Sequence, residues 1–145
     1  SGKHINNGAC PYCEQIFSRY PGFNLVLKKW FQGIQGRFPE AHISCAGRGM
    51  MDQESLKLRG SSRASYGKSA HNYNCAIDIF HNEPGNLYPE AWFSQTIGAN
   101  LIGDLIWYGT KGSIFYELPH VEVRAWRSIA QAGQVKLVEP NLKLA

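Results

Sequence analysis

Two short stretches of the chain carry residue types that bind metal ions. The first contains His71 and ends in Asp78, and the second begins with Glu117 and ends in His120. Two imidazoles and one carboxylate suit a divalent ion of intermediate softness such as zinc, and three protein ligands leave a fourth position for water. The remaining acid, Glu117, is suited to accept a proton from that water. The pattern predicts a metal site of the catalytic type.

The local geometry favours a single shared site. In residues 76–80 two isoleucines alternate, so Asp78 points to the opposite face of a predicted strand. Glu117 and His120 would point to opposite faces of an uninterrupted strand. Pro119, however, cannot donate to a β-ladder and restricts the residue before it. We expect a bend there that brings both side chains toward one ion.

These motifs resemble the signature of the M15 metallopeptidases, which include D-alanyl-D-alanine carboxypeptidases and the L-alanyl-D-glutamate endopeptidases of phage endolysins. That signature reads Ser-x-His, then Gly, Ala and Asp at fixed spacing, and later an acid, two residues and His. The resemblance implies that His71, Asp78 and His120 bind zinc and that Glu117 is the catalytic acid. It extends from about residue 23 to about residue 127.

Further positions follow from the same resemblance. Residues 44–48, followed by Gln53, look like the family's Ser-Gly-Tyr-Arg segment with its trailing Gln, which implies that Arg48 stabilises substrate and oxyanion. Ser69 matches the signature serine, and we assign Ser69 and Gln53 to substrate binding. Three side chains of the loop over residues 60–68 either touch substrate or are solvated: Arg63, Lys68 and Tyr66, of which we assign Tyr66 to the substrate site.

The sequence departs from the signature at two places. Asn74 stands where the family has glycine, and asparagine also tolerates a left-handed backbone conformation, so we expect the turn to be retained. Cys45 and Ala46 replace the commoner Gly-Tyr, which changes the shape of the substrate site rather than the metal ligands.

Apolar spacing predicts the elements that position these residues. A helix over residues 23–38 would be capped by Asn24 and ended by Pro39. Glu122 either accepts a hydrogen bond from a ligand imidazole or is an exposed strand residue. The other predicted elements are a strand over 41–45, helices over 52–58, 91–105 and 124–132, a strand continuing from residue 120 to 123, and an edge strand or loose tail over 134–138.

The resemblance implies an α+β fold with a small antiparallel sheet flanked by helices, similar to Hedgehog and D-Ala-D-Ala peptidase domains. At 145 residues we expect one globular domain overall, with residues 1–22 as an N-terminal segment and residues 23–145 as the peptidase domain. No apolar stretch approaches the length of a membrane-spanning helix, so we expect no membrane insertion. A scattered net charge of +4 disfavours nucleic acid as a partner and favours a weak approach to an anionic bacterial wall.

Four cysteines in a chain of this size do not make a disulfide framework, so reduced thiols are expected. The segment Cys10-Pro11-Tyr12-Cys13 also occurs in glutaredoxins, but the residues before it are polar and turn-rich rather than a buried strand, which disfavours redox chemistry. A structural zinc completed by His42 or Cys45 is an alternative. Those two residues would face opposite ways on a strand, and His42 is predicted to be solvated.

The expected function is that of a zinc-dependent peptidoglycan peptidase acting on stem peptides, with the L-Ala-D-Glu bond favoured, as in phage endolysins. Cleavage of D-Ala-D-Ala is the alternative within the family, and a non-catalytic zinc-binding module is the alternative of another class. We expect a monomer. The N-terminus lacks the apolar run of a secretory signal, so we expect synthesis in a bacterial host cytoplasm and action on the wall after release or from a virion.

Overall fold

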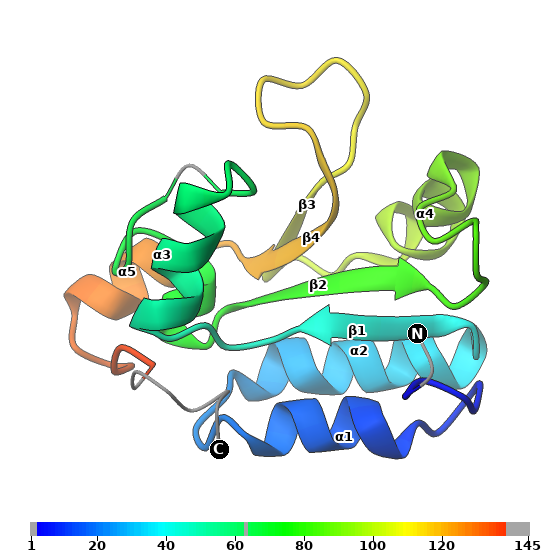
Figure 1. The fold of residues 1–145 in the computed structure, drawn as a ribbon, viewed down its shortest axis with the longest axis horizontal. Helices are drawn as coiled ribbons and strands as arrows, with labels where there is room; N and C mark the ends of the chain where they lie inside the picture. Colours follow the sequence, from blue (N-terminus) through cyan, green and yellow to red (C-terminus); the bar gives the residue numbers. More distant parts are fainter. Residues whose placement is uncertain (1–2, 63, 139–145) are drawn as a thin grey trace.

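The computed structural model describes residues 3–62 and 64–138. Within these residues, five α-helices and two short 3₁₀ helices alternate with the four strands of one sheet (Figure 1). In chain order they are α1 (Pro11–Ser18), α2 (Leu25–Arg37), β1 (Ala41–Cys45), α3 (Met50–Leu58), η1 (Ala70–Tyr73), β2 (Ala76–His81), α4 (Glu90–Thr96), η2 (Gly98–Asn100), β3 (Leu105–Tyr108), β4 (Glu117–Val123) and α5 (Trp126–Gln131). The predicted α+β class, with a small antiparallel sheet flanked by helices, is confirmed.

The sheet has the strand order β1-β2-β4-β3, and all neighbouring strands are antiparallel. Asp78 of β2 pairs with His120 of β4 on one side of the strand and with Cys45 of β1 on the other side. Directly opposed residues of antiparallel strands project from the same face. The register therefore brings three strands' side chains together around Asp78.

Helices α1 and α2 run along the outer edge of β1 (Figure 1). The Cys13 sulfur accepts a hydrogen bond from the Ile43 N–H at 3.5 Å, and Gln35 Nε2 donates to the Ala41 carbonyl at 2.8 Å. These two bonds satisfy backbone groups that an edge strand would otherwise leave unpaired. Side chains of α1 and α2 thus supply hydrogen-bond partners to the outer edge of β1.

Helix α2 follows its sequence prediction closely. The Asn24 side chain accepts from the Leu27 N–H at 3.0 Å, and the helix ends at Arg37, two residues before Pro39. Leu27, Phe31 and Ile34 are buried on its inner face. Phe17 of α1 packs against the Phe31 ring with centroids 6.0 Å apart, so residues before 23 share the core of the rest of the chain.

One predicted element differs from the structure. The helix predicted over residues 91–105 ends at Thr96, because Gly98 and Gly103 interrupt it, and Leu105 begins β3 instead. Of the two alternatives for residues 134–138, the edge strand does not form, and the Val138 N–H donates to the Asn72 carbonyl at 2.7 Å. Arg63 lies outside the described residues. None of the helices within residues 3–62 and 64–138 has the length and apolar character needed to cross a bilayer.

The prediction that His42 is a solvated strand residue is wrong. Its side chain is completely buried, and its ring packs near the rings of Phe80 and His4. The alternation of β1 correctly separates His42 from Ile43, but the face that carries His42 is covered by the N-terminal segment and α1. A strand pattern alone does not report that cover.

Candidate active site

Two histidines meet on one carboxylate oxygen at the centre of the sheet. His71 Nε2 lies 3.4 Å from Asp78 Oδ1, and His120 Nδ1 lies 3.3 Å from the same oxygen. The two imidazole rings are 5.1 Å apart between centroids and inclined by 66°. His71 and His120 are both buried, and the Asp78 side chain is 22% exposed. The three predicted metal ligands therefore converge, with one side open.

Two of the separations among these atoms are those expected around a zinc ion. With Zn–N and Zn–O distances of about 2.0–2.2 Å, tetrahedrally arranged ligand atoms are separated by about 3.4 Å. The measured separations to Asp78 Oδ1 are 3.4 and 3.3 Å. The donor set of two imidazoles and one carboxylate is that of a site with three protein ligands and an open position.

The outward-facing nitrogen of each histidine is held by a hydrogen bond. His71 Nδ1 donates to the Ala46 carbonyl at 2.7 Å, and His120 Nε2 donates to Glu122 Oε1 at 2.7 Å. In the neutral rings, with these nitrogens protonated, the lone pairs are on His71 Nε2 and His120 Nδ1, both of which face Asp78. Glu122 was predicted either to accept a hydrogen bond from an imidazole or to be exposed. The structure supports the first alternative, with His120 as the donor.

Glu122 is itself held in place by two further donors. Trp126 Nε1 donates to its Oε2 at 2.9 Å, and the Tyr108 hydroxyl donates to the same oxygen at 3.3 Å. Burial alone would raise the pKa of Glu122, but the bonds from His120, Trp126 and Tyr108 outweigh it and lower that pKa. An ionised, fixed carboxylate therefore lies behind His120.

The backbone around His71 is set by two local features. The Ser69 hydroxyl accepts from the His71 N–H at 3.2 Å and caps η1. Asn74 ends η1 with φ of 57°, the left-handed conformation expected for the residue in place of the signature glycine. That turn leads directly into β2, so the seven-residue spacing from His71 to Asp78 spans a capped turn and the start of a strand.

The predicted bend at Pro119 is confirmed. Trp107 of β3 pairs with Val121, whereas the next residue, Tyr108, pairs with Glu117. Residues 118–120 of β4 therefore bulge away from β3, while His120 still pairs with Asp78 of β2. Trp107 Nε1 donates to the Leu118 carbonyl inside this bulge at 2.7 Å. As a result Glu117 Oε2 lies 3.8 Å from His120 Nδ1, the nitrogen directed at Asp78.

Arg48 reaches Asp78 from the end of β1. Its Nη2 lies 3.4 Å from Asp78 Oδ2, the oxygen not shared by the histidines, and its Nη1 donates to Gln53 Oε1 at 3.2 Å. The Arg48 N–H donates to the His71 carbonyl at 3.0 Å, which ties this segment to η1. A Cβ at Gly47 would overlap the Tyr20 ring, so only glycine permits this close approach.

The cluster has strongly shifted protonation equilibria. Burial lowers the pKa of His71, but the Asp78 carboxylate outweighs it and raises that pKa to about 10. Burial lowers the pKa of His120 as well, but hydrogen bonds to Asp78 and Glu122 outweigh burial and raise that pKa to about 9. The histidines hold the pKa of Asp78 well below its usual range despite burial. Zinc and protons therefore compete for the same two nitrogens, and binding should strengthen with rising pH.

Cys45 offers a second arrangement, in which the ligand atoms of Cys45, His71 and Asp78 all lie within 4.8 Å of one another. However, Cys45 Sγ lies 3.8 Å from His71 Nδ1, the nitrogen bonded to the Ala46 carbonyl. A metal ion between Cys45 and His71 would have to replace that bond. The pair of His71 Nε2 and His120 Nδ1 needs no such change.

A pocket of about 330 Å³ opens beside Asp78 and Arg48. Arg19 and Arg59 line it together with Arg48, and Asp52 is also part of the lining. A larger pocket of about 580 Å³ lies against the N-terminal segment and α1, but neither Asp78 and Arg48 nor the two histidines line it. We therefore take the smaller pocket, which Asp78 and Arg48 line, as the candidate substrate site.

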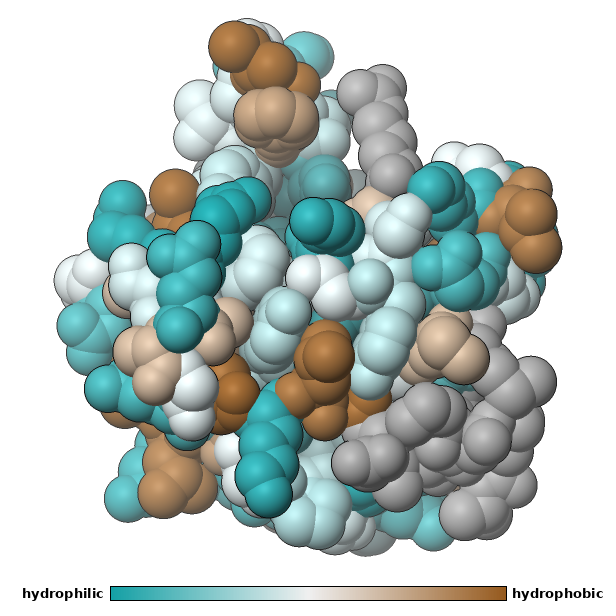
Figure 2. All heavy atoms as spheres, turned by 90° about the vertical axis from the view of Figure 1, so that its left-hand side faces the viewer, coloured by the Kyte–Doolittle hydropathy of each residue, from teal (hydrophilic) through white to brown (hydrophobic). Residues whose placement is uncertain are grey.

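The β3–β4 loop projects away from the sheet and leads directly into Glu117 (Figure 1). Figure 2 shows hydrophobic side chains at its tip, above a largely polar face. Ile114, Phe115 and Tyr116 are exposed there, with Ile114 at 92%. This loop and the arginine-lined pocket are thus both next to the metal-binding geometry.

The predicted substrate-binding residues occupy different surroundings. Gln53 is fully buried and bonded internally, with Nε2 donating to the Ala64 carbonyl at 2.6 Å, so it orients Arg48. Ser69 caps η1. Tyr66 is half-buried, and its hydroxyl donates to the Val138 carbonyl at 2.5 Å. Direct contact of these three with substrate stays a prediction, while their structural bonds support the turn and Arg48.

Replacing Glu122 with glutamine should weaken zinc binding roughly 10- to 100-fold, the usual cost of removing a carboxylate behind a ligand histidine. Titration with a competing chelator measures the change. Tyr108→Phe, which removes one donor to Glu122 and leaves the carboxylate, should have a smaller effect. Equal affinity of Glu122→Gln and the unmodified chain would show that His120 does not bind the ion through Nδ1.

Comparison with solved structures finds this fold in the L-Ala D-Glu endopeptidase ChiX of Serratia marcescens. The match has a TM-score of 0.62 and 18% sequence identity, and covers 81% of this chain and 90% of that chain. No protein-family model matches the chain, and a search of curated proteins finds no match either. The chain therefore shares its fold, over most of its length, with an L-Ala D-Glu endopeptidase.

Proposed function

We propose that the chain is a zinc-dependent peptidase that hydrolyses an amide bond in peptidoglycan stem peptides. One observation carries this proposal: His71 and His120 direct their free nitrogens at the same oxygen of Asp78, while their other nitrogens are tied to Ala46 and Glu122. A closed structural site would need a fourth protein ligand, whereas this set leaves a position open beside Glu117.

Each remaining residue has a distinct role in the proposed reaction. A bound zinc ion supplies Lewis acidity, which lowers the pKa of water and polarises a carbonyl group. Glu117 accepts the proton of the attacking water and later returns it to the leaving amine. Its side chain is 60% exposed and lies 3.8 Å from His120 Nδ1, within reach of both the ligand nitrogens and solvent.

Arg48 is suited to the charge that develops on the carbonyl oxygen. Gln53 and Asp78 hold its guanidinium at the pocket wall, so little reorganisation is needed when negative charge appears. Arg19 and Arg59 add positive charge to the same wall. Stem peptides carry free carboxylates, which this lining would attract.

The bond that we propose is L-Ala-D-Glu, because the solved structure that shares the fold is described as an L-Ala D-Glu endopeptidase. Digesting purified peptidoglycan and identifying the new termini by mass spectrometry tests this. A new N-terminal D-glutamyl residue is the expected product. Released D-alanine would instead indicate carboxypeptidase activity. No new termini from zinc-loaded protein would favour a non-catalytic zinc-binding module.

Arg48→Ala should lower kcat and kcat/KM by similar factors, because an arginine that stabilises developing charge acts mainly in the transition state. Removing one oxyanion donor typically costs about 2.7–4 kcal/mol, or roughly a hundred- to thousandfold in rate. Zinc content should not change. Steady-state kinetics on a defined wall fragment measure the effect.

Two further variants sharpen this test. Arg48→Lys should recover activity only in part, since an ammonium group lacks the planar fork of donors. Arg37→Ala is the matched control and should leave kcat and KM unchanged, because Arg37 is exposed, ends α2 and does not line the pocket. A change in KM alone for Arg48→Ala would assign it to ground-state substrate binding instead.

A further inference from the structure

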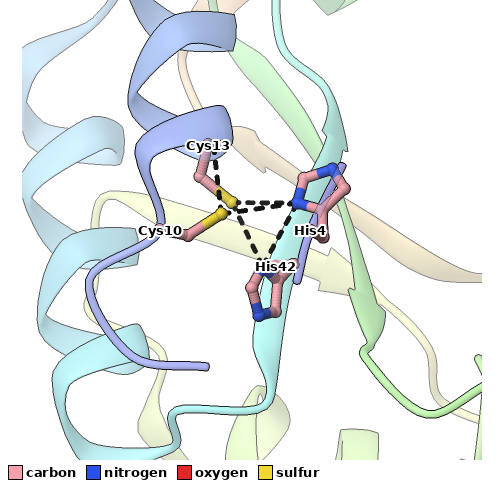
Figure 3. Close-up of side chains that lie close together, drawn as sticks. All are labelled: His4, Cys10, Cys13 and His42. Carbon is pink, nitrogen blue, oxygen red and sulfur yellow. Dashed lines mark hydrogen bonds between the residues drawn. The ribbon is translucent and has the colours of Figure 1, made fainter. Parts of the chain in front are cut away.

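A second group of side chains of metal-binding types lies near the start of β1, whereas Asp78 pairs with Cys45 at the end of that strand. His4 comes from the N-terminal segment, Cys10 and Cys13 from the start of α1, and His42 from β1 (Figure 3). All four are buried, with exposures between 0% and 5%. Figure 3 shows both sulfurs and the near edges of both imidazoles pointing into one small space.

The distances within this group match a tetrahedral zinc site. The Cys10 and Cys13 sulfurs each lie 3.6 Å from His4 Nδ1, the Cys13 sulfur lies 3.5 Å from His42 Nδ1, and the two Nδ1 atoms are 3.2 Å apart. With Zn–S of about 2.3 Å and Zn–N of about 2.0–2.1 Å, a tetrahedron has S to N edges of about 3.6 Å and N to N edges of about 3.3 Å.

The surroundings supply hydrogen-bond donors to both sulfurs and orient the His42 imidazole. Cys10 Sγ accepts from the Cys13 N–H at 3.3 Å, and Cys13 Sγ accepts from the Ile43 N–H at 3.5 Å and from Gln35 Nε2 at 3.6 Å. His42 Nε2 contacts Asn7 Oδ1 at 3.2 Å, which leaves its Nδ1 free to bind a metal.

These environments do not suit a redox-active pair. Reactive thiols are partly exposed and have lowered pKa values. Cys13 is completely buried, and burial raises its pKa to about 12. A dication would balance two thiolates in this buried space.

We propose that His4, Cys10, Cys13 and His42 bind one structural zinc ion, separate from the predicted catalytic ion. Four protein ligands close the site and leave no position for water, as in structural zinc centres. Two sulfur and two imidazole ligands in tetrahedral arrangement select zinc over the hard cations. The ion would fasten the N-terminal segment and α1 to the edge of the sheet. Cys10 also lines the 580 Å³ pocket, which provides an entry path.

The proposal does not depend on peptidase activity, and metal counting separates the two. The full chain, purified without added metal, should contain two zinc ions per molecule, as measured by inductively coupled plasma mass spectrometry. His120→Ala and the double variant Cys10→Ser/Cys13→Ser should each lose one. Cys75→Ser, a buried thiol outside the group, is the matched control and should keep both.

X-ray absorption on His120→Ala isolates the second ion. The expected spectrum has two sulfur neighbours at about 2.3 Å and two nitrogen neighbours. A single zinc that His120→Ala removes completely would overturn the structural site and leave the catalytic one intact. A single zinc that the double cysteine variant removes, but His120→Ala retains, would instead overturn the catalytic assignment.

A measurement on the unmodified chain covers the case in which the double variant does not fold. Alkylation followed by peptide mapping should leave Cys10 and Cys13 unmodified until a chelator is added, and modify both afterwards. Cys75, buried in the core, should stay protected throughout and reports that the fold persists. Equal modification with and without chelator, or a Cys10–Cys13 disulfide in the native protein, would overturn the proposal.

Discussion

Glu117→Gln is expected to reduce hydrolysis of peptidoglycan by roughly 10²- to 10⁴-fold, the range for loss of a general base. Glutamine keeps the size and polarity of the side chain but cannot take a proton from water. Because Glu117 is proposed as a base and not as a ligand, the zinc content and thermal unfolding temperature should be unchanged. Turnover of a defined stem-peptide fragment, with metal analysis of the same sample, measures both.

Glu90→Gln is the control for this variant, since Glu90 is an exposed acid in the first turn of α4, away from the site. It removes the same charge and should leave turnover unchanged. Near-normal turnover of Glu117→Gln would assign proton transfer to another group. Loss of zinc from Glu117→Gln would instead make Glu117 a ligand, 3.8 Å from His120 Nδ1.

His120→Ala should abolish hydrolysis and remove one equivalent of zinc. The variant takes away one of three protein ligands and also leaves Glu122, a buried carboxylate, without its shortest hydrogen bond. We therefore expect a lower unfolding temperature as well, because an unpaired buried charge is destabilising. Metal analysis, turnover and thermal unfolding are measured on one preparation.

The matched control is His81→Ala, a histidine at the end of β2 whose ring contacts Trp92 rather than the metal cluster. It should keep zinc and turnover. Full zinc content in His120→Ala, with the cysteines unmodified, would show that the ion lies elsewhere. Activity rescue by added imidazole would support the ligand role, since a free imidazole can occupy the space left by the side chain.

The sequence alone determined the local features of this protein. Asn24 caps α2, Asn74 adopts a left-handed conformation, and Pro119 interrupts β4, all as predicted. Such features depend on interactions within a few residues, so spacing and residue type are sufficient to predict them. The convergence of His71, Asp78 and His120 was also predicted, but from the resemblance of the two motifs to a known family, since Asp78 and His120 are 42 residues apart.

The tertiary structure alone decided which side chains are covered. The second group of ligands joins His4 and Cys13 to His42, 29 residues after Cys13, through the contact of α1 with the β1 edge. No local spacing reports that contact, which is why His42 was predicted to be solvated. The helix predicted over residues 91–105 was too long for a related reason, since apolar residues recur at the same intervals whether they continue a helix or enter a strand. Burial in the packed core, rather than periodicity, distinguishes the two.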